Sequence, residues 1–229
     1  MSASTKTESR TTMADLLRRL GGVGPERVLM TPTPGTATEA DLLRLVKEGK
    51  CFYELIEGTL VEKVMGYNEA GLAMWIGRLL GRYLDVNDLG ELIGADGTVR
   101  LLPGLVRIPD VAFTRHENLP PGGWPEEAIP DLVPDLAIEV LSRSNTDEEM
   151  ELKTKDYFLA GVTLVWLVDP RTRTVTVFTS PDESREFGVT ESLDGGDVLP
   201  GLVLPVRQIF ERLPAPVTKP VKGKRKPKA

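Results

Sequence analysis

The stretch 134–141, Pro-Asp-Leu-Ala-Ile-Glu-Val-Leu, constrains the fold most, because it has the pattern of an interior strand that contains a carboxylate. Side chains alternate between the two faces of a strand, and from Leu136 onward both faces are apolar except at Glu139. Apolar residues on both faces are typical of a strand that is covered on both sides. The sequence therefore predicts a central strand of an α/β sheet with one acid buried inside it.

Glu139 needs a partner in such a place. An ionised carboxylate that is buried without a partner loses its hydration, which costs several kcal/mol of folding free energy. A cation, a metal ion or a bound proton would remove this penalty. A structural ion pair and a functional site both satisfy the requirement, and Glu139 alone does not distinguish them.

Two further charged residues are predicted to face Glu139. Asp110 follows Pro109 at the mouth of an apolar strand, within the stretch 106–114 that we predict as one strand. Lys153 falls on the core-facing side of a helix predicted to end near residue 160, whereas Lys155 points outward. Each residue also has a simpler explanation, because Pro-Asp often forms turns and lysine side chains extend from apolar faces to water.

The composition limits the metals that this chain could hold. It has one cysteine, Cys51, and one histidine, His116, which excludes a cysteine-rich zinc site and a multi-histidine centre. Any metal must be held by oxygen, which favours Mg²⁺ or Mn²⁺. Such an ion lowers the pKa of a bound water, and a lysine orients that water or stabilises developing charge, as phosphodiester hydrolysis requires. Glu54, Glu57 or Glu69 could complete the site.

The rest of the chain alternates between helical and strand patterns. We expect, in order, a short outlying helix (13–20), a helix with its cap within 36–39, a hairpin (51–56 and 59–64), a long helix (69–84), strands (91–93, 98–102 and 106–114) and a loop (115–132). The Glu139 strand follows, then a helix that starts within 144–149 and runs to about 160, an apolar strand (163–168), a strand (173–179), further short strands and a last helix (206–213).

Three segments are expected: an N-terminal extension (1–35) that is partly disordered with a short helix, one domain (36–213), and a basic disordered tail (214–229). The net charge is −6, but six lysines and arginines crowd the last eleven positions, and without them it is −12. The tail is either a solvated end or a contact for phosphate backbones. No apolar run approaches the roughly 18 residues of a membrane span, so we expect a cytoplasmic protein without a membrane partner.

Several short motifs together resemble a known family. The motifs are, in order, Tyr-Glu-Leu-Ile-Glu-Gly (53–58), Ile-Pro-Asp-Val-Ala-Phe (108–113), Pro-Asp-Leu-Ala-Ile-Glu-Val-Leu-Ser (134–142), Lys153 with Tyr157, Ala-Gly-Val (160–162) and Val-Trp-Leu-Val-Asp-Pro (165–170). In order and spacing they resemble the Uma family of restriction-type endonucleases, within the PD-(D/E)xK nuclease superfamily. The resemblance covers roughly residues 52–211.

The resemblance implies a restriction-endonuclease-like α/β core, in which helices flank a mixed central sheet, with an added N-terminal β-hairpin and C-terminal strands. It makes Asp110 the first metal acid and Glu139 the second. In the wider superfamily the lysine lies two residues after that glutamate, where this chain has Leu141. The family's lysine comes from the following helix and matches Lys153. Glu54 resembles the family's hairpin glutamate, which has a supporting role.

The chain departs from the family's pattern at two places. Many relatives have a sequence that resembles Ser-Pro-Ser after the glutamate strand, whereas this chain has Ser-Arg-Ser at 142–144. Many also have a histidine near the start of the long helix, where this chain has Asn68 and Glu69. The first change leaves the metal acids untouched. The second removes any histidine-assisted step and leaves Glu69 as a candidate substitute.

The leading hypothesis is a Mg²⁺- or Mn²⁺-dependent endonuclease that hydrolyses phosphodiesters in DNA. Asp110 and Glu139 would bind the metal, Lys153 would assist the attacking water, and Glu54 would support them. A symmetric homodimer would allow one such site per chain to cut both strands. One alternative is a non-catalytic nucleic-acid-binding or mobile-element accessory module with the same fold. Another is a structural cluster, in which Lys153 neutralises Glu139 and Asp110 caps a turn.

Overall fold

The computed structural model describes residues 12–49 and 52–214. Residues 1–11 of the extension that is predicted to be partly disordered (1–35), Cys51, and the predicted basic tail after Pro214 lie outside the described residues. Within the described part of the chain, no helix combines the length and the apolar character that crossing a bilayer requires.

The elements follow the predicted order, with one important exception. The helices are α1 (Met13–Arg19), α2 (Glu39–Lys47), α3 (Tyr67–Leu84), α4 (Asp147–Ala160) and α5 (Val206–Ile209), with short 3-10 helices at Pro25–Arg27 and His116–Asn118. The strands are β1 (Tyr53–Ile56), β2 (Thr59–Glu62), β3 (Gly90–Ile93), β4 (Val99–Leu102), β5 (Leu105–Arg107), β6 (Val111–Arg115), β7 (Leu136–Val140), β8 (Leu164–Asp169), β9 (Thr174–Ser180), β10 (Glu183–Phe187), β11 (Ser192–Gly195) and β12 (Leu199–Pro205).

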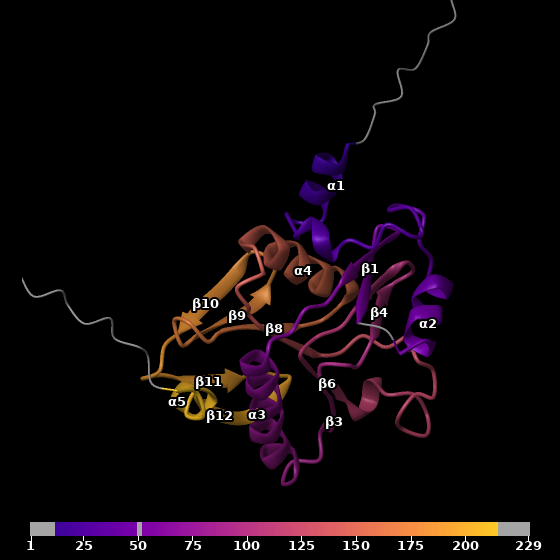
Figure 1. The fold of residues 1–229 in the computed structure, drawn as a ribbon. Coiled ribbons are helices and arrows are strands. Elements are labelled where there is room, and N and C mark those ends of the chain that lie inside the picture. Colours follow the sequence, from indigo (N-terminus) through magenta and orange to yellow (C-terminus); the bar gives the residue numbers. More distant parts are fainter. Residues whose placement is uncertain (1–11, 50–51, 215–229) are drawn as a thin grey trace, which may run out of the picture.

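In the described residues these strands form three sheets (Figure 1). The central sheet has the order β10-β9-β8-β7-β6-β3, and a smaller sheet has the order β2-β1-β5-β4. Strands β11 and β12 pair with each other. In the central sheet β7 and β8 are parallel and the other neighbours are antiparallel, so the predicted mixed α/β sheet is confirmed.

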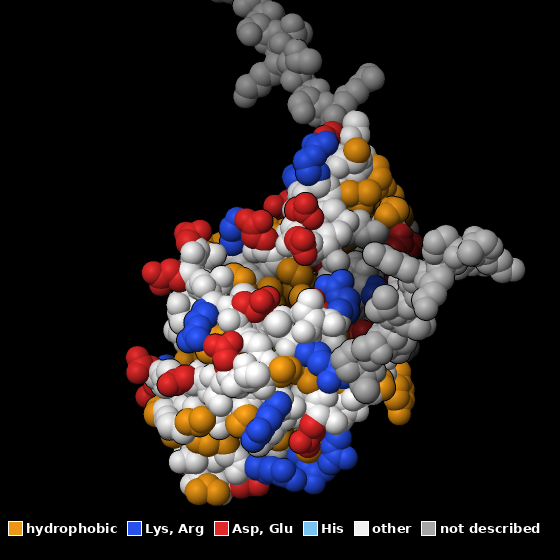
Figure 2. Space-filling model, turned by 90° about the vertical axis from the view of Figure 1, so that its left-hand side faces the viewer, with side chains coloured by type: hydrophobic (Ala, Val, Ile, Leu, Met, Phe, Trp, Pro, Cys, Tyr) orange, Lys and Arg blue, Asp and Glu red, His pale blue; other side chains and the backbone are white. Residues whose placement is uncertain are grey.

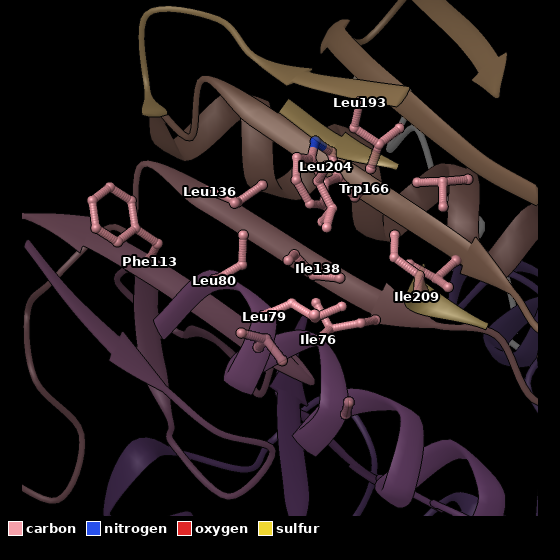
Figure 3. Packing of buried hydrophobic residues seen from close by; sticks show 14 of the residues in the cluster. Ile76, Leu79, Leu80, Phe113, Leu136, Ile138, Trp166, Leu193, Leu204 and Ile209 are labelled. Atoms are coloured by element: carbon pink, nitrogen blue, oxygen red, sulfur yellow. The ribbon is translucent and has the colours of Figure 1, made fainter. Parts of the chain in front are cut away.

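Helices cover both faces of the central sheet. On one face, α3, α5 and the β11-β12 pair enclose the larger core, in which Ile76 and Leu80 of α3 and Ile138 of β7 are buried (Figure 3). On the other face, Tyr157 of α4 packs in one cluster with Ala137 of β7. The strand β7 is therefore covered on both sides, and its second face, which carries Glu139, points toward α4.

Local signals fix the position of α4. The Thr146 hydroxyl accepts a hydrogen bond from the backbone N–H of Glu149, which caps the first turn. Gly161 ends the helix with φ 108°, a left-handed conformation that favours glycine. Because α4 connects the parallel strands β7 and β8, its inner face lies against the sheet.

The predicted strand 106–114 is wrong, because the structure divides it into β5 and β6, which belong to different sheets. Pro109 lies at the division, and proline has no N–H to donate to a neighbouring strand. Asp110 resumes the pairing, with its backbone N–H 3.0 Å from the carbonyl oxygen of Ile138. The crossing from one sheet to the other therefore places Asp110 at the seam between them.

Two further expectations need correction. The last helix is shorter than predicted, since α5 ends at Ile209. The N-terminal segment is not an outlying decoration, because Leu16 and Leu20 pack in a buried cluster with Ile56 and Val61 of the hairpin. Arg27, further along this segment, reaches the interior of the protein.

Candidate active site

Asp110 and Glu139 lie on neighbouring strands, as the sequence predicts. Asp110 immediately precedes β6, Glu139 lies within β7, and these strands pair with each other. The Oδ2 atom of Asp110 accepts a hydrogen bond of 2.6 Å from the backbone N–H of Val140, the residue after Glu139. Both acids line one small cavity of about 20 Å³, here called the acid cavity. That volume is close to the space that one water molecule needs.

Lys153 joins the two sheets at the acid cavity. Its Nζ atom lies 2.9 Å from Oε1 of Glu139 in β7 and 2.9 Å from Oε1 of Glu54 in β1. All four predicted site residues are buried, with exposed fractions of 2% for Glu54, 3% for Asp110, 4% for Glu139 and 6% for Lys153. The structure thus brings the four together and buries their charges.

Glu54 has the most complete set of partners. Besides Lys153, it accepts hydrogen bonds from the Arg107 guanidinium at 2.8 Å and from the backbone N–H of Ile108 at 3.1 Å. Arg107 is itself buried and also contacts Asp156 of α4. Glu54 is therefore part of an ion network that ties the hairpin, β5 and α4 together.

Lys63 is a cation of the site that the sequence analysis missed. It follows β2, its Nζ atom lies 2.7 Å from Oδ1 of Asp110, and it donates a hydrogen bond to the carbonyl oxygen of Ile108. Among the described residues, this buried Oδ1 atom has no hydrogen-bond partner, so its contact with Lys63 is an ion pair. The sequence signal was a lysine at the end of the hairpin that carries Glu54.

Tyr157 and Arg27 complete the surroundings of the acids. The Tyr157 hydroxyl, one helical turn after Lys153, donates a hydrogen bond of 2.5 Å to Oε1 of Glu139. Arg27 lines the acid cavity and pairs with Glu149 at 2.9 Å. The resemblance had singled out Tyr157, whereas no local sequence pattern distinguishes Arg27 from a surface arginine.

The two buried glutamates differ in electrostatic state. Burial raises the pKa of Glu139, and the nearby charge of Asp110 adds to the rise, against the attraction of Lys153. Burial would also raise the pKa of Glu54, but the attraction of Lys153 and Arg107 outweighs it and holds that pKa well below the ordinary value. A carboxyl with a raised pKa is under-compensated in its ionised form.

The pKa values of Lys153 and Tyr157, the two groups of α4 that contact Glu139, are both raised, but for different reasons. Burial would lower the pKa of Lys153, but Glu139 and Glu54 outweigh it and raise that pKa. Burial and the charge of Glu139 both raise the pKa of Tyr157. Lys153 is therefore an ammonium ion and Tyr157 a neutral hydroxyl across the physiological range.

A larger groove gives access to one side of the site. This entrance groove, of about 450 Å³, lies between α3 and β3, and Asp110 and Lys63 form part of its wall. Met65, Ala73 and Ile93 make the rest of the wall largely apolar. Of the predicted site acids, Asp110 therefore lines this open groove, whereas Glu139 and Lys153 line only the acid cavity.

Of the other candidate residues considered in the sequence, only one lines the acid cavity. Glu69, at the start of α3, lines the acid cavity. Glu57 lies at the hairpin turn, is exposed, and has its carboxylate 3.7 Å from Arg19. His116 pairs with Asp88 near β3 and does not line the acid cavity.

The donor groups fit a hard cation. Oδ1 of Asp110 is a buried carboxylate oxygen without a hydrogen bond from the described residues, and Glu139 is an under-compensated carboxylate on the same cavity. In the described ranges no three carboxylate, imidazole or thiol side chains are placed to share an ion. Mg²⁺ is commonly held by one or two carboxylates and completed by waters and substrate oxygens, so two acids suffice.

Comparisons with known proteins agree with this fold. The sequence model of the Uma2 family, described as "Putative restriction endonuclease", matches residues 39–207. A crystal structure described as that of "a putative nuclease belonging to DUF820 from Anabaena variabilis" has a TM-score of 0.63 and 18% sequence identity, over 70% of this chain and 90% of that chain. No curated protein sequence shows significant similarity to the chain.

Proposed function

Because the chain belongs to the Uma2 family of restriction-type endonucleases, we propose that it hydrolyses phosphodiester bonds in DNA with the help of Mg²⁺ or Mn²⁺. The observation that supports this most is the meeting of Asp110, Glu139 and Lys153 at one cavity. In this proposal the two acids hold the metal, as the family resemblance implies. A bound metal would supply an activated water and neutralise charge on the phosphate.

Lys153 acts as a cation in the proposed mechanism. Its raised pKa keeps it protonated, so it does not serve as a general base. Glu54 and Glu139 hold its ammonium group from two sides, which fixes it before the substrate arrives. From this position it stabilises negative charge that develops on the phosphate or orients the attacking water by donating a hydrogen bond.

Glu54 and Tyr157 have positioning roles. Glu54 accepts hydrogen bonds from Arg107 on Oε2 and from the N–H of Ile108 on Oε1, and the same Oε1 atom lies 2.9 Å from Nζ of Lys153. Tyr157 donates its hydroxyl hydrogen to Glu139 and thereby fixes the orientation of that carboxylate. Neither residue has to touch the substrate for its loss to affect the reaction.

A nuclease assay tests the proposal. The purified chain is incubated with supercoiled and linear DNA in Mg²⁺, in Mn²⁺ and in EDTA. Asp110→Asn and Glu139→Gln should each lower the cleavage rate at least about a hundredfold, as loss of one preorganised electrostatic group commonly does. EDTA should abolish cleavage in the wild type.

Two matched variants keep this test interpretable. Asp41→Asn and Glu151→Gln remove one carboxylate each from exposed ion pairs on α2 and α4. They should cleave like the wild type. Equal cleavage by Asp110→Asn and the controls, in proteins with native circular dichroism, would refute the proposed roles.

A second candidate function has one observation in its favour. Asp110 and Glu139 each already have a lysine at ion-pair distance, namely Lys63 and Lys153. Such neutralised acids would also suit a non-catalytic nucleic-acid-binding or mobile-element accessory module. DNA binding that persists in Asp110→Asn, together with no metal-dependent cleavage by the wild type, would favour this function.

A further inference from the structure

Several arginines of the described residues have no carboxylate partner. Among the described residues, those that form no ion pair are Arg78, Arg82, Arg143, Arg173 and Arg207. In contrast, the arginines of α1, α2 and β4 pair with carboxylates. Unpaired cations in one region are a feature that attracts an anionic partner.

Three guanidinium groups surround one tryptophan of α3. The Cζ atoms of Arg212, Arg78 and Arg82 lie 4.5, 5.6 and 5.9 Å from the centre of the Trp75 ring. Trp75 is buried, and its Nε1–H donates a hydrogen bond of 2.8 Å to the carbonyl oxygen of Gln208. The ring therefore holds three positive charges together at the surface.

A second group of arginines lines a groove beside the acid cavity. This side groove, of about 310 Å³, is lined by Arg143, Arg171 and Arg173, and by Glu69 of α3. Glu69 also lines the acid cavity, so the two spaces share a wall. Leu213, which lines the side groove, directly follows Arg212 in the chain.

Few carboxylates oppose these arginines. Arg171 is paired with Asp169, and Glu211 lies 3.9 Å from Arg212. Glu69 stands where the side groove meets the acid cavity. In Figure 2, a group of Lys and Arg side chains lies low on the face shown, at the height of α3 and α5, and other basic side chains lie higher up among Asp and Glu side chains.

We propose that these arginines form a binding surface for the phosphate backbone of double-stranded DNA. The surface, here called the arginine band, consists of Arg143 and Arg173 in the side groove and Arg212, Arg78 and Arg82 around Trp75. It rests on the proposed function in one respect, since it would hold DNA beside the acid cavity. Guanidinium groups suit this partner because their forked N–H donors match phosphate oxygens.

The dimensions and the burial of Trp75 favour a duplex backbone. Glu69 and Arg82 are thirteen residues apart in α3, about 20 Å along the helix axis at roughly 1.5 Å per residue. At about 3.4 Å per nucleotide, this length follows one strand for about six nucleotides. Proteins that bind single strands stack bases on exposed aromatic rings, but Trp75 is covered by arginines and is not free to stack.

DNA binding without catalysis tests the arginine band. Fluorescence anisotropy of a labelled 20-base-pair duplex is measured with the full chain in EDTA, over a series of salt concentrations. Arg78→Gln/Arg82→Gln should weaken binding and lower the slope of log K against log salt by about two, because two phosphate contacts are lost. Arg78→Lys/Arg82→Lys, which keeps the charges, should restore most of the slope.

A matched control separates the arginine band from net charge. Arg18→Gln/Arg44→Gln removes the same charge from α1 and α2, where both arginines are paired with aspartates. This variant should keep the wild-type slope. An equal loss in both double variants, or an unchanged slope in Arg78→Gln/Arg82→Gln, would overturn the proposal.

The remaining outcomes also decide between hypotheses. Competition with single-stranded DNA and double-stranded RNA should require higher competitor concentrations than competition with duplex DNA, and tighter binding of either would overturn the assigned partner. If the wild type never cleaves DNA yet binds it through the arginine band, the hydrolase proposal fails and this inference stands. If cleavage occurs and Arg78→Gln/Arg82→Gln binds DNA normally, the hydrolase proposal stands and the arginine band is refuted.

Discussion

Glu54 and Glu139 are two buried glutamates that share one lysine but have opposite pKa shifts. Each has an Oε1 atom 2.9 Å from Nζ of Lys153, and each is almost fully buried. The pKa of Glu54 lies well below the ordinary value, whereas the pKa of Glu139 lies above it. Burial and the shared cation are alike at the two positions, so the difference arises from the other neighbours.

The neighbours of Glu54 are mainly donors. It faces the Arg107 guanidinium and the N–H of Ile108 in addition to Lys153, so its negative charge is well compensated. Glu139 has the Tyr157 hydroxyl and Lys153, but it also faces the negative charge of Asp110. The negative charge of Glu54, which supports the fold, is therefore compensated by its neighbours. The negative charge of Glu139, the proposed metal ligand, is not fully compensated. Such a disparity is common between supporting and functional carboxylates.

The largest effect on stability is expected at Glu54. Glu54→Gln leaves two buried cations, Arg107 and Lys153, with reduced compensation, so it should lower the free energy of unfolding by about 3–5 kcal/mol. Urea denaturation at pH 7 measures this change. Glu151→Gln, which removes an exposed partner of Lys155 on the same helix α4, should leave the midpoint unchanged. A loss at Glu54 no larger than that of the control would refute the assigned supporting role.

The loss at Glu54 should depend on pH. The pKa of Glu54 is below its ordinary value of 4.5, so its ionised form contributes stability above about pH 4.5 and loses it as pH falls toward the depressed pKa. The difference in unfolding free energy between Glu54→Gln and the wild type should therefore shrink below about pH 4.5. Denaturation curves from pH 3 to pH 7 measure it.

A smaller effect is expected at Tyr157. Tyr157→Phe removes a buried hydrogen bond to a carboxylate, which should lower the free energy of unfolding by about 1.5–3 kcal/mol. It should also raise the pKa of Glu139 further, because the ionised form loses a donor. Denaturation and carbon NMR of the Glu139 carboxyl measure the two changes. Tyr83→Phe removes a bond to the neutral carbonyl of Pro200 and should cost less.

The smallest effect on stability is expected at Glu139. Because its ionised form is under-compensated, Glu139→Gln should change the free energy of unfolding at pH 7 by less than about 1 kcal/mol. The sign of its pH dependence is opposite to that of Glu54. The wild type loses stability as pH rises from about 4.5 through the raised pKa, and the variant does not. A loss as large as that of Glu54→Gln would remove the distinction between the two acids.

Much of the site was predictable from local patterns. The alternation in 134–141 predicted a covered strand with Glu139 inside it, and the helical spacing placed Lys153 on the inner face of α4. Asp110 was identified from its place after Pro109 and from the family resemblance. Glu54 was one of three candidate acids, and the family resemblance singled it out. In the structure all four meet, although their catalytic and metal-binding roles remain proposals.

Other features depend on contacts between distant segments. The stretch 106–114 has the pattern of one strand, and only the pairing of β5 with β1 and of β6 with β7 shows that it crosses between two sheets. Lys63 and Arg27 reach the acids because the hairpin and the N-terminal segment pack against α4 and β6. No local pattern marks Arg27, and Lys63 is marked only by its place at the end of the hairpin that carries Glu54. A cation looks the same in a sequence whether its partner is water or a buried acid.

The sequence by itself determined which residues are apolar on both faces of β7, that its carboxylate would need a partner, and that any metal would be held by oxygen. Only the tertiary structure decided how that need is shared, with Arg107 completing the surroundings of Glu54 and Asp110 opposing the charge of Glu139. The physical reason is that periodicity depends on neighbours in the chain, whereas the electrostatic energy of a buried charge depends on groups that meet only when distant segments fold together.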